Sequence, residues 1–182
     1  MAPSSKLKTP AQINNMDYEE FIDVFGNVIE HCSLCAAAVW RYRPFKDVKY
    51  LHEEICKFVD QLPPAGGEGI LRSHPDLAGR AASEGLLTKE SNQEQRAAGL
   101  SDLTQEERKQ LAQMNDMYRS KFGFPFVICA RKNKKDVILE GLRTRLNNSQ
   151  EAELQKGLTE VKKICYLRLL DLVEHDGIES RL

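Results

Sequence analysis

The chain has 182 residues, with 26 basic and 27 acidic side chains and a formal net charge of -1 at pH 7. This length is typical of one domain with a single core. The balanced charge and the lack of a recurring Lys/Arg-rich face argue against nucleic acid or an anionic membrane as a partner. Apolar runs such as Ala36–Trp40 are far shorter than the roughly 18 residues of a membrane span. We therefore expect a soluble protein that acts on small molecules or contacts other proteins.

Most of the chain repeats its apolar residues with the 3.6-residue period of a helix. Capping residues mark the starts and Pro or Gly the ends, as at Pro63-Pro64 and Gly123. The sequence therefore predicts an all-α, single-domain helical bundle that occupies residues 13–179. The predicted helices begin at Asp17, Ser33, Asp47, Thr88, Thr104 and Ser149.

The two ends of the chain are predicted to lie outside the bundle. Residues 1–12 contain Lys, Pro and Ser but no apolar block of the secretory kind, so a disordered tail is expected there. The last three residues, Ser180, Arg181 and Leu182, are similar to the Ser-Lys-Leu address for peroxisomes, with Arg in place of Lys. The alternative for this tripeptide is a frayed terminus without a targeting role.

Five cysteines, an odd number without a signal peptide, indicate free thiols in a reducing compartment. Cys32 and Cys35 form a CxxC pair, which can be half of a zinc site or a redox pair. However, the sequence has no second CxxC or HxxxH to complete four ligands, and no strand precedes the pair. The sequence therefore favours thiols that pack between helices, and no metal site is predicted.

His74 is a candidate for acid-base chemistry because it lies between Ser73 and Pro75 at a junction between loop and helix. Pro75 biases His74 to an extended backbone, and Asp76 is expected to cap the helix that follows. The unperturbed pKa of His is nearest to neutrality, so a held imidazole can give or take a proton. The alternative is a surface or capping histidine.

Glu94 is the candidate partner of His74. With Thr88 as helix N-cap, Ser91 and Gln95 share one face with Glu94 close beside it, so this helix can line a cleft. A carboxylate near His74 would select its tautomer and raise its basicity. The alternative is that this polar stretch is simply a solvated helix face.

Two further features are predicted to position polar groups. Pro125 forbids a regular helix, so Phe126–Ala130 should run extended, with backbone groups that bond either to protein and water or to a ligand. In the C-terminal helix, predicted from Ser149 to about Glu174, Arg168 falls on the apolar stripe. Arg168 then either snorkels to water or faces a buried anion or carbonyl-rich ligand.

Four separated motifs, in this order, resemble one family: HPDLAGR at His74–Arg80, SNQEQ followed by AGL at Ser91–Leu100, KFGFPFVICAR at Lys121–Arg131, and EVKKICYLRL at Glu160–Leu169. Over about Ile13 to Leu172 the chain is similar to 2-oxo-4-hydroxy-4-carboxy-5-ureidoimidazoline (OHCU) decarboxylases, which complete the conversion of urate to allantoin. The resemblance implies an all-helical decarboxylase without cofactor or metal, commonly a homodimer, that yields (S)-allantoin. It also implies a peroxisomal location, reached through an import receptor that binds Ser180, Arg181 and Leu182.

The resemblance also implies roles for individual residues. It gives His74 the catalytic role and Glu94 that of its acidic partner. The residues implied to surround the substrate are Pro75, Ser91, Asn92, Gln93, Glu94, Gln95, Phe126, Val127, Ile128, Cys129, Ala130 and Arg168. Two other classes stay open on residues alone: a helical interaction module without activity, and a metal hydrolase that uses His74, Asp76 and Glu94.

Overall fold

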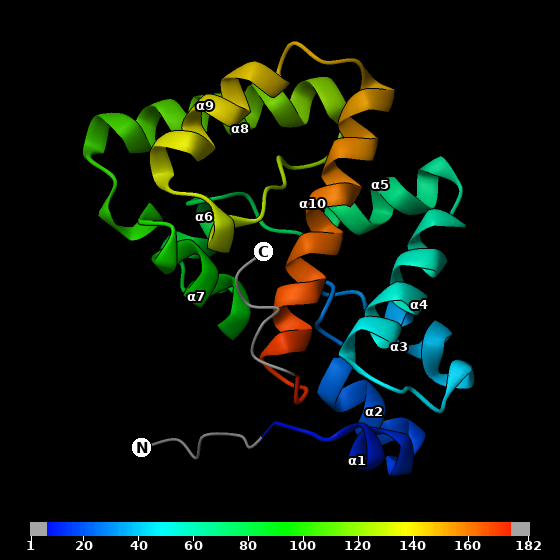
Figure 1. Cartoon of the computed structure of the whole chain (residues 1–182). Coiled ribbons are helices and arrows are strands. Elements are labelled where there is room, and N and C mark those ends of the chain that lie inside the picture. The colour runs from blue at the N-terminus through cyan, green and yellow to red at the C-terminus, as the bar shows by residue number, and fades with distance from the viewer. Residues whose placement is uncertain (1–6, 176–182) are drawn as a thin grey trace. The chain divides into compact units, whose positions relative to one another are not determined.

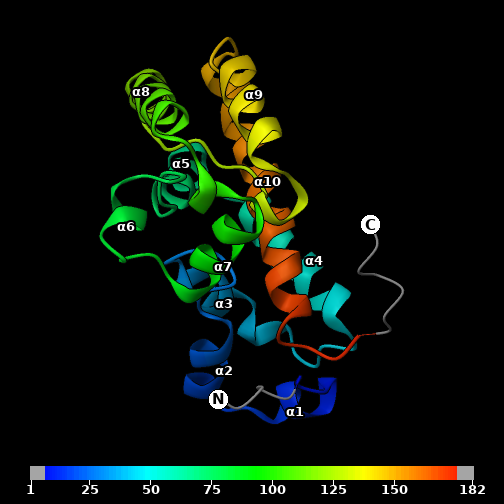
Figure 2. The same cartoon turned by 90° about the vertical axis from the view of Figure 1, so that its left-hand side faces the viewer.

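The computed structural model describes residues 7–175, and within them it has ten α-helices, three short 3-10 helices and one isolated bridge. Figures 1 and 2 show the helical elements from two sides. The predicted all-α class is confirmed. The α-helices are α1 Pro10–Asn15, α2 Tyr18–Phe25, α3 Ser33–Val39, α4 Val48–Asp60, α5 Pro64–Arg72, α6 Arg80–Ser83, α7 Lys89–Ala97, α8 Gln105–Phe122, α9 Lys135–Arg145 and α10 Gln150–Leu170. The 3-10 helices are η1 Trp40–Tyr42, η2 Leu100–Asp102 and η3 Ala130–Lys132.

The chain forms two compact units. Unit 1 contains the described residues up to Leu62 together with those from Lys162 onward, and unit 2 is the continuous stretch Pro63–Val161. No helix within residues 7–175 is both long and apolar enough to span a bilayer. The sequence predicted one domain and gave no sign of this division.

Unit 1 is built from α1–α4 and the C-terminal part of α10. Asp17 and Asp47 cap α2 and α4, and each side chain accepts a hydrogen bond from a backbone N–H three residues on, at 2.8 and 2.7 Å. The aromatic side chains of Phe21, Phe25 and Phe45 are fully buried in its core. Both starts agree with the capping residues predicted from the sequence.

The structure corrects the predicted disordered tail for residues 7–12. The Lys8 N–H donates to the Leu172 carbonyl at 2.8 Å, and Thr9 forms a capping box with Gln12 around Pro10, the first residue of α1. The missing apolar block suggested a tail, but Thr9, Pro10 and Gln12 together form a local helix start. Residues 1–6 and the tripeptide 180–182 lie outside the described residues.

Unit 2 contains α5–α9 and the first part of α10. Helix α8 begins at a Thr104–Glu107 capping box and ends at Gly123, whose φ is +74°, as the sequence predicts. Helices α8 and α9 pack together in Figures 1 and 2. Helix α5 approaches α10 closely at Gly157, where a Cβ would lie 2.8 Å from a methyl carbon of Leu71. A side chain at position 157 would therefore require Leu71 to shift.

Candidate active site

His74 lies directly after α5 and is held by the carbonyl groups of that helix. Its backbone N–H donates to the Leu71 carbonyl at 3.1 Å, and its ring atom Nδ1 lies 2.9 Å from the Ile70 carbonyl oxygen. The residue is buried, with 7% of its surface exposed. A carbonyl oxygen can only accept, so Nδ1 carries the hydrogen and Nε2 is the basic nitrogen of the neutral ring. The sequence predicted that a carboxylate would select the tautomer of His74. In the structure, the Ile70 carbonyl accepts from Nδ1 and so selects it.

The loop after His74 is attached to α7. Gln95 of α7 accepts a hydrogen bond at its Oε1 from the Ala78 N–H, at 2.8 Å. Ala78 has a φ of +47°, in the left-handed region that a residue with a Cβ rarely adopts. The buried Gln95 side chain thus fixes an uncommon backbone conformation four residues from His74.

The same loop is attached to α8, and this changes the predicted role of Asp76. Asn115 donates to the Leu77 carbonyl at 3.1 Å, and Arg119 forms an ion pair with Asp76 at 2.9 Å. The prediction that Asp76 caps the next helix is wrong, because α6 begins only at Arg80, without a side-chain cap. Asp76 instead stabilises the loop through a side chain 43 positions away, which sequence spacing does not reveal.

Helix α7 has one buried polar face and one exposed face. Thr88 caps it as predicted, accepting from the Ser91 N–H at 3.2 Å. Ser91, Glu94 and Gln95 are buried. A purely solvated helix face is therefore wrong for these three residues. The side chains of Asn92 and Gln93 are exposed, so the structure does not bring them into this buried group.

The predicted extended segment is non-helical from Phe126 to Cys129, and Ala130 already belongs to η3. Its backbone bonds to protein: Arg145 donates to the Val127 carbonyl at 2.8 Å, and the Cys129 N–H donates to Glu160 at 2.8 Å. Of the two alternatives for this backbone, bonding to protein is therefore confirmed at Val127 and Cys129. The side chains of Phe126, Val127, Cys129 and Ala130 are buried, and that of Ile128 is half-buried.

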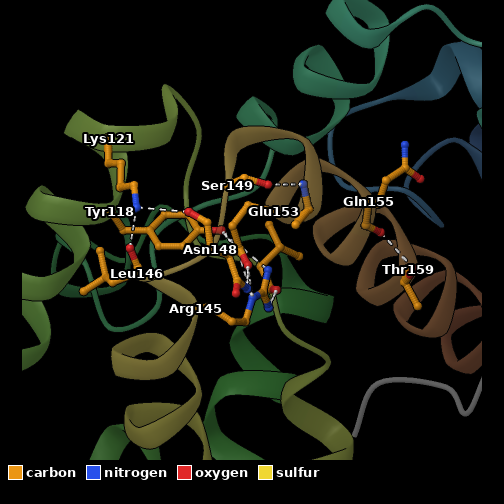
Figure 3. A network of polar contacts seen from close by, with 11 residues as sticks. Tyr118, Lys121, Arg145, Leu146, Asn148, Ser149, Glu153, Gln155 and Thr159 are labelled. Carbon is orange, nitrogen blue, oxygen red and sulfur yellow. Dashed lines mark hydrogen bonds and ion pairs between the residues drawn. The ribbon is translucent and has the colours of Figure 1, made fainter.

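Sequence reasoning missed the charged network that holds this segment (Figure 3). Arg145 of α9 pairs with Glu153 of α10 at 2.9 Å, and both side chains are buried. Tyr118 also donates to Glu153, and Asn148 donates to it at 2.6 Å. Burial, followed by the hydrogen bond to Glu153, raises the pKa of Tyr118. No local signal indicates this network, because its members come from three helices and a turn.

Helix α7 packs against η3, which brings Glu94 toward the end of the extended segment. Burial raises the pKa of the Cys129 thiol, and the charges of Glu160 and Glu94 raise it further. The α7 end is also joined to α9, because the Lys135 N–H donates to the Ala98 carbonyl at 3.0 Å. Unit 2 therefore brings the α7 face close to the segment after Pro125.

Arg168 belongs to unit 1 and is buried there, with 3% of its surface exposed. Its Nη1 donates to Glu30 Oε2 at 2.6 Å and to the Asn27 carbonyl at 2.9 Å. Snorkelling to water is therefore wrong. The sequence left a buried anion as the other alternative, and the anion beside Arg168 is the fully buried Glu30 carboxylate.

Candidate metal ligands are not gathered in the described part of the chain. Among residues 7–175, no three His, Cys, Asp or Glu side chains come together in a way that could hold a metal ion. Asp76, a ligand in the hydrolase alternative, is paired with Arg119. The hydrolase reading thus gains no support from the arrangement of its residues.

Comparison with known proteins shows the family of the chain. Residues 14–170 match the family described as OHCU decarboxylase. A Xenopus laevis protein named 2-oxo-4-hydroxy-4-carboxy-5-ureidoimidazoline decarboxylase is 51% identical over 170 residues, which cover 93% of this chain and 97% of that protein. A mouse protein of the same name is 50% identical over 94% of this chain and 96% of its own length.

Solved structures share the fold at lower identity. A crystal structure of (S)-allantoin synthase superposes with a TM-score of 0.74 at 22% identity, over 91% of this chain but only 54% of that longer chain. A crystal structure of OHCU decarboxylase in the presence of (S)-allantoin has a TM-score of 0.65 at 22% identity, over 84% of this chain and 96% of its own. The family match and the two relatives at half identity, each over nearly its whole length, decide the assignment: this chain is a member of the OHCU decarboxylase family.

Proposed function

We propose that this chain removes carbon dioxide from OHCU and releases (S)-allantoin, as a carboxy-lyase of urate degradation. The observation that carries this proposal is the 51% identity to a decarboxylase of that name over 97% of its length. The burial of His74, Glu94 and Gln95 supports it, since polar side chains are rarely buried without a structural or chemical role.

The chemistry of OHCU explains what the protein has to supply. One ring carbon carries a hydroxyl and a carboxylate and lies next to a C=N bond. When carbon dioxide leaves, the electron pair of the broken C–C bond forms a C=C bond to that neighbour, and the ring nitrogen takes up charge and a proton. The resulting enol gains a proton on its ureido-bearing carbon and loses its hydroxyl proton. The ring itself is the electron sink, so positioning and proton transfer remain for the protein.

His74 is the residue that transfers these protons in our proposal. Its Nδ1–H is held by the Ile70 carbonyl, so Nε2 is the nitrogen that takes the hydroxyl proton and delivers a proton to one face. Delivery from one side gives a single enantiomer. Glu94 acts as the acidic partner, whose buried carboxylate stabilises the protonated imidazole.

The substrate is positioned by residues around this pair. Gln95 uses its Oε1 for the Ala78 N–H, and its amide NH2 can donate to a substrate carbonyl. The remainder of the proposed wall in unit 2 is formed by Pro75, by the buried Ser91 on the face of α7 that carries Glu94 and Gln95, and by the segment Phe126–Ala130. The family motif alone, and no geometry, supports Arg168 as a further ligand. There Arg168 would bind a carbonyl oxygen on which negative charge grows, since gripping the departing carboxylate would stabilise the ground state.

Assembly and location are part of the proposal. The family resemblance supports a homodimer, and the tripeptide Ser180, Arg181 and Leu182 supports peroxisomal import by the receptor for such signals. Sedimentation of the purified chain tests the first point. For the second, a tagged chain with an unaltered C-terminus should enter peroxisomes, whereas one that lacks Leu182 should not.

The activity itself is tested with OHCU generated freshly from urate. Purified protein should accelerate the appearance of the circular dichroism signal of (S)-allantoin well above the spontaneous rate, and the product should be a single enantiomer. A racemic product formed at the spontaneous rate would refute the proposed function. In that event the second class, a helical interaction module, would become the better explanation.

A further inference from the structure

Cys32 and Cys35 of unit 1 have their sulfur atoms in direct contact. Cys32 is the N-cap residue of α3 and Cys35 lies in the first turn, with their Sγ atoms 3.6 Å apart. Cys32 is half-buried and Cys35 is fully buried, so Cys32 is the more accessible of the two residues. The sequence alone favoured packing thiols, but this contact puts the two sulfurs in position for chemistry.

The two thiols differ in acidity because one donates to the other. The hydrogen bond with Cys35 lowers the pKa of Cys32 to about 6, against the opposing effect of burial. The same hydrogen bond, followed by burial, raises the pKa of Cys35. At neutral pH Cys32 is therefore mostly thiolate, the form that attacks peroxides, and Cys35 keeps its proton.

We propose that Cys32 and Cys35 are a site of oxidation by hydroperoxides, at which the two sulfurs join in an intrachain disulfide. The Cys32 thiolate attacks one peroxide oxygen and becomes a sulfenic acid, while the O–O bond breaks and hydroxide (or alkoxide) leaves. The Cys35 sulfur then attacks the Cys32 sulfur, and the sulfenic oxygen leaves as water. With hydrogen peroxide, the two thiols lose two protons and two electrons in total, and these reduce the peroxide to two waters.

The short distance between the two sulfur atoms favours the second step. A disulfide bond is about 2.05 Å long, so the sulfurs must approach by about 1.5 Å from their present 3.6 Å. Cys32 is the N-cap of α3 and Cys35 lies in the first turn, so the two side chains start from neighbouring backbone positions. Cys32 follows Glu30 by two positions in the chain, and Glu30 forms an ion pair with Arg168. The disulfide would therefore form close in sequence to that ion pair.

Cys56 provides a matched control in the same unit. It is also half-buried, but burial raises its pKa to about 11. At neutral pH its thiolate fraction is lower than that of Cys32 by a factor of ~10³ to 10⁴, while its thiolate is intrinsically more nucleophilic by ~10². Cys32 should therefore react with hydrogen peroxide at least about tenfold faster than Cys56.

The experiment uses the full-length reduced protein, treated with hydrogen peroxide and then quenched with catalase. Free thiols are alkylated and located by peptide mass spectrometry. We expect the protein to lose the mass of two hydrogen atoms, Cys32 and Cys35 to escape alkylation together, and dithiothreitol to restore both. In Cys35→Ser the reaction should stop at a sulfenic acid on Cys32 that dimedone traps. Cys56→Ser should still form the disulfide.

Several results would overturn the proposal, and none depends on a variant that folds. Unchanged alkylation of Cys32 and Cys35 in the wild-type chain would do so. A faster reaction at Cys56, a disulfide between Cys35 and Cys165, or a disulfide between chains would also do so. Far-UV circular dichroism of each variant separates a change in reactivity from a loss of fold.

Discussion

Replacing Arg145 by Met should destabilise the protein strongly, because Arg145 neutralises a carboxylate with no access to water. Glu153 has 0% of its surface exposed, and without Arg145 the side-chain donors that remain to it within residues 7–175 are Tyr118 and Asn148. Breaking a buried ion pair on one side typically costs about 3 to 5 kcal/mol. The Val127 carbonyl also loses its donor, so we expect a loss in this range.

Urea unfolding followed by far-UV circular dichroism measures this effect. For a slope of about 2 kcal/mol per molar urea, the midpoint should fall by about 2 M. The matched control is Arg143→Met on the same helix, since Arg143 is half-exposed and contacts the exposed Glu140 at 3.6 Å. Its midpoint should stay close to that of the wild type.

A double variant tests the physical reason. When Arg145→Met is combined with Glu153→Leu, the uncompensated carboxylate is gone, and the double variant should be more stable than Arg145→Met alone. If Arg145→Met shifts the midpoint no more than Arg143→Met, the buried pair does not have the role argued here. A double variant that is less stable than the sum of the two single changes would contradict the reasoning as well.

Four other outcomes are expected. His74→Ala should fold normally yet lose at least about 100-fold in kcat, and wild-type turnover would refute its role. Glu94→Gln should lower kcat more than it changes KM, whereas equal damage to both would indicate a structural residue. Arg168→Lys should raise KM on the order of tenfold, which corresponds to about 1.4 kcal/mol, because Lys lacks the planar, two-pronged guanidinium group. An unchanged KM would argue against contact between Arg168 and the substrate. Burial lowers the pKa of His52, so the unfolded chain binds a proton at this residue more readily than the folded chain. The free energy of unfolding should therefore fall between about pH 7.5 and about pH 5.5, and it should fall less in His52→Gln. An equal dependence of stability on pH in the two proteins would contradict this.

The elements with local signals at their ends were predictable from the sequence. Helix α8 has a capping box at Thr104 and a glycine at its end, and both act within a few residues. Helices α5 and α9 were not predicted because neither has a side-chain cap at its start. Two glycines near the start of α5, Gly66 and Gly67, further weaken the helical pattern.

The candidate site was predictable only in part. The place of His74 before Pro75 and that of Glu94 on the helix capped by Thr88 made both residues candidates, and Pro125 predicted the non-helical segment that follows it. The side chains that hold these groups lie far away in sequence: Asn115 reaches Leu77 across 38 positions, and Arg145 reaches Val127 across 18. Such pairings depend on tertiary packing, which neither periodicity nor capping patterns encode.

The discontinuous make-up of unit 1 has a consequence for synthesis on the ribosome. Residues 63–161 are consecutive, so the packing partners of unit 2 are all available before the chain is finished. Helices α1–α4 emerge first but need residues 162–175, and Lys8 obtains its partners Leu172 and Glu174 only at the end. Unit 1 is therefore completed last although its helices α1–α4 are synthesised first, and nascent chains that stall before residue 162 carry an incomplete unit 1 and are the ones most in need of chaperones.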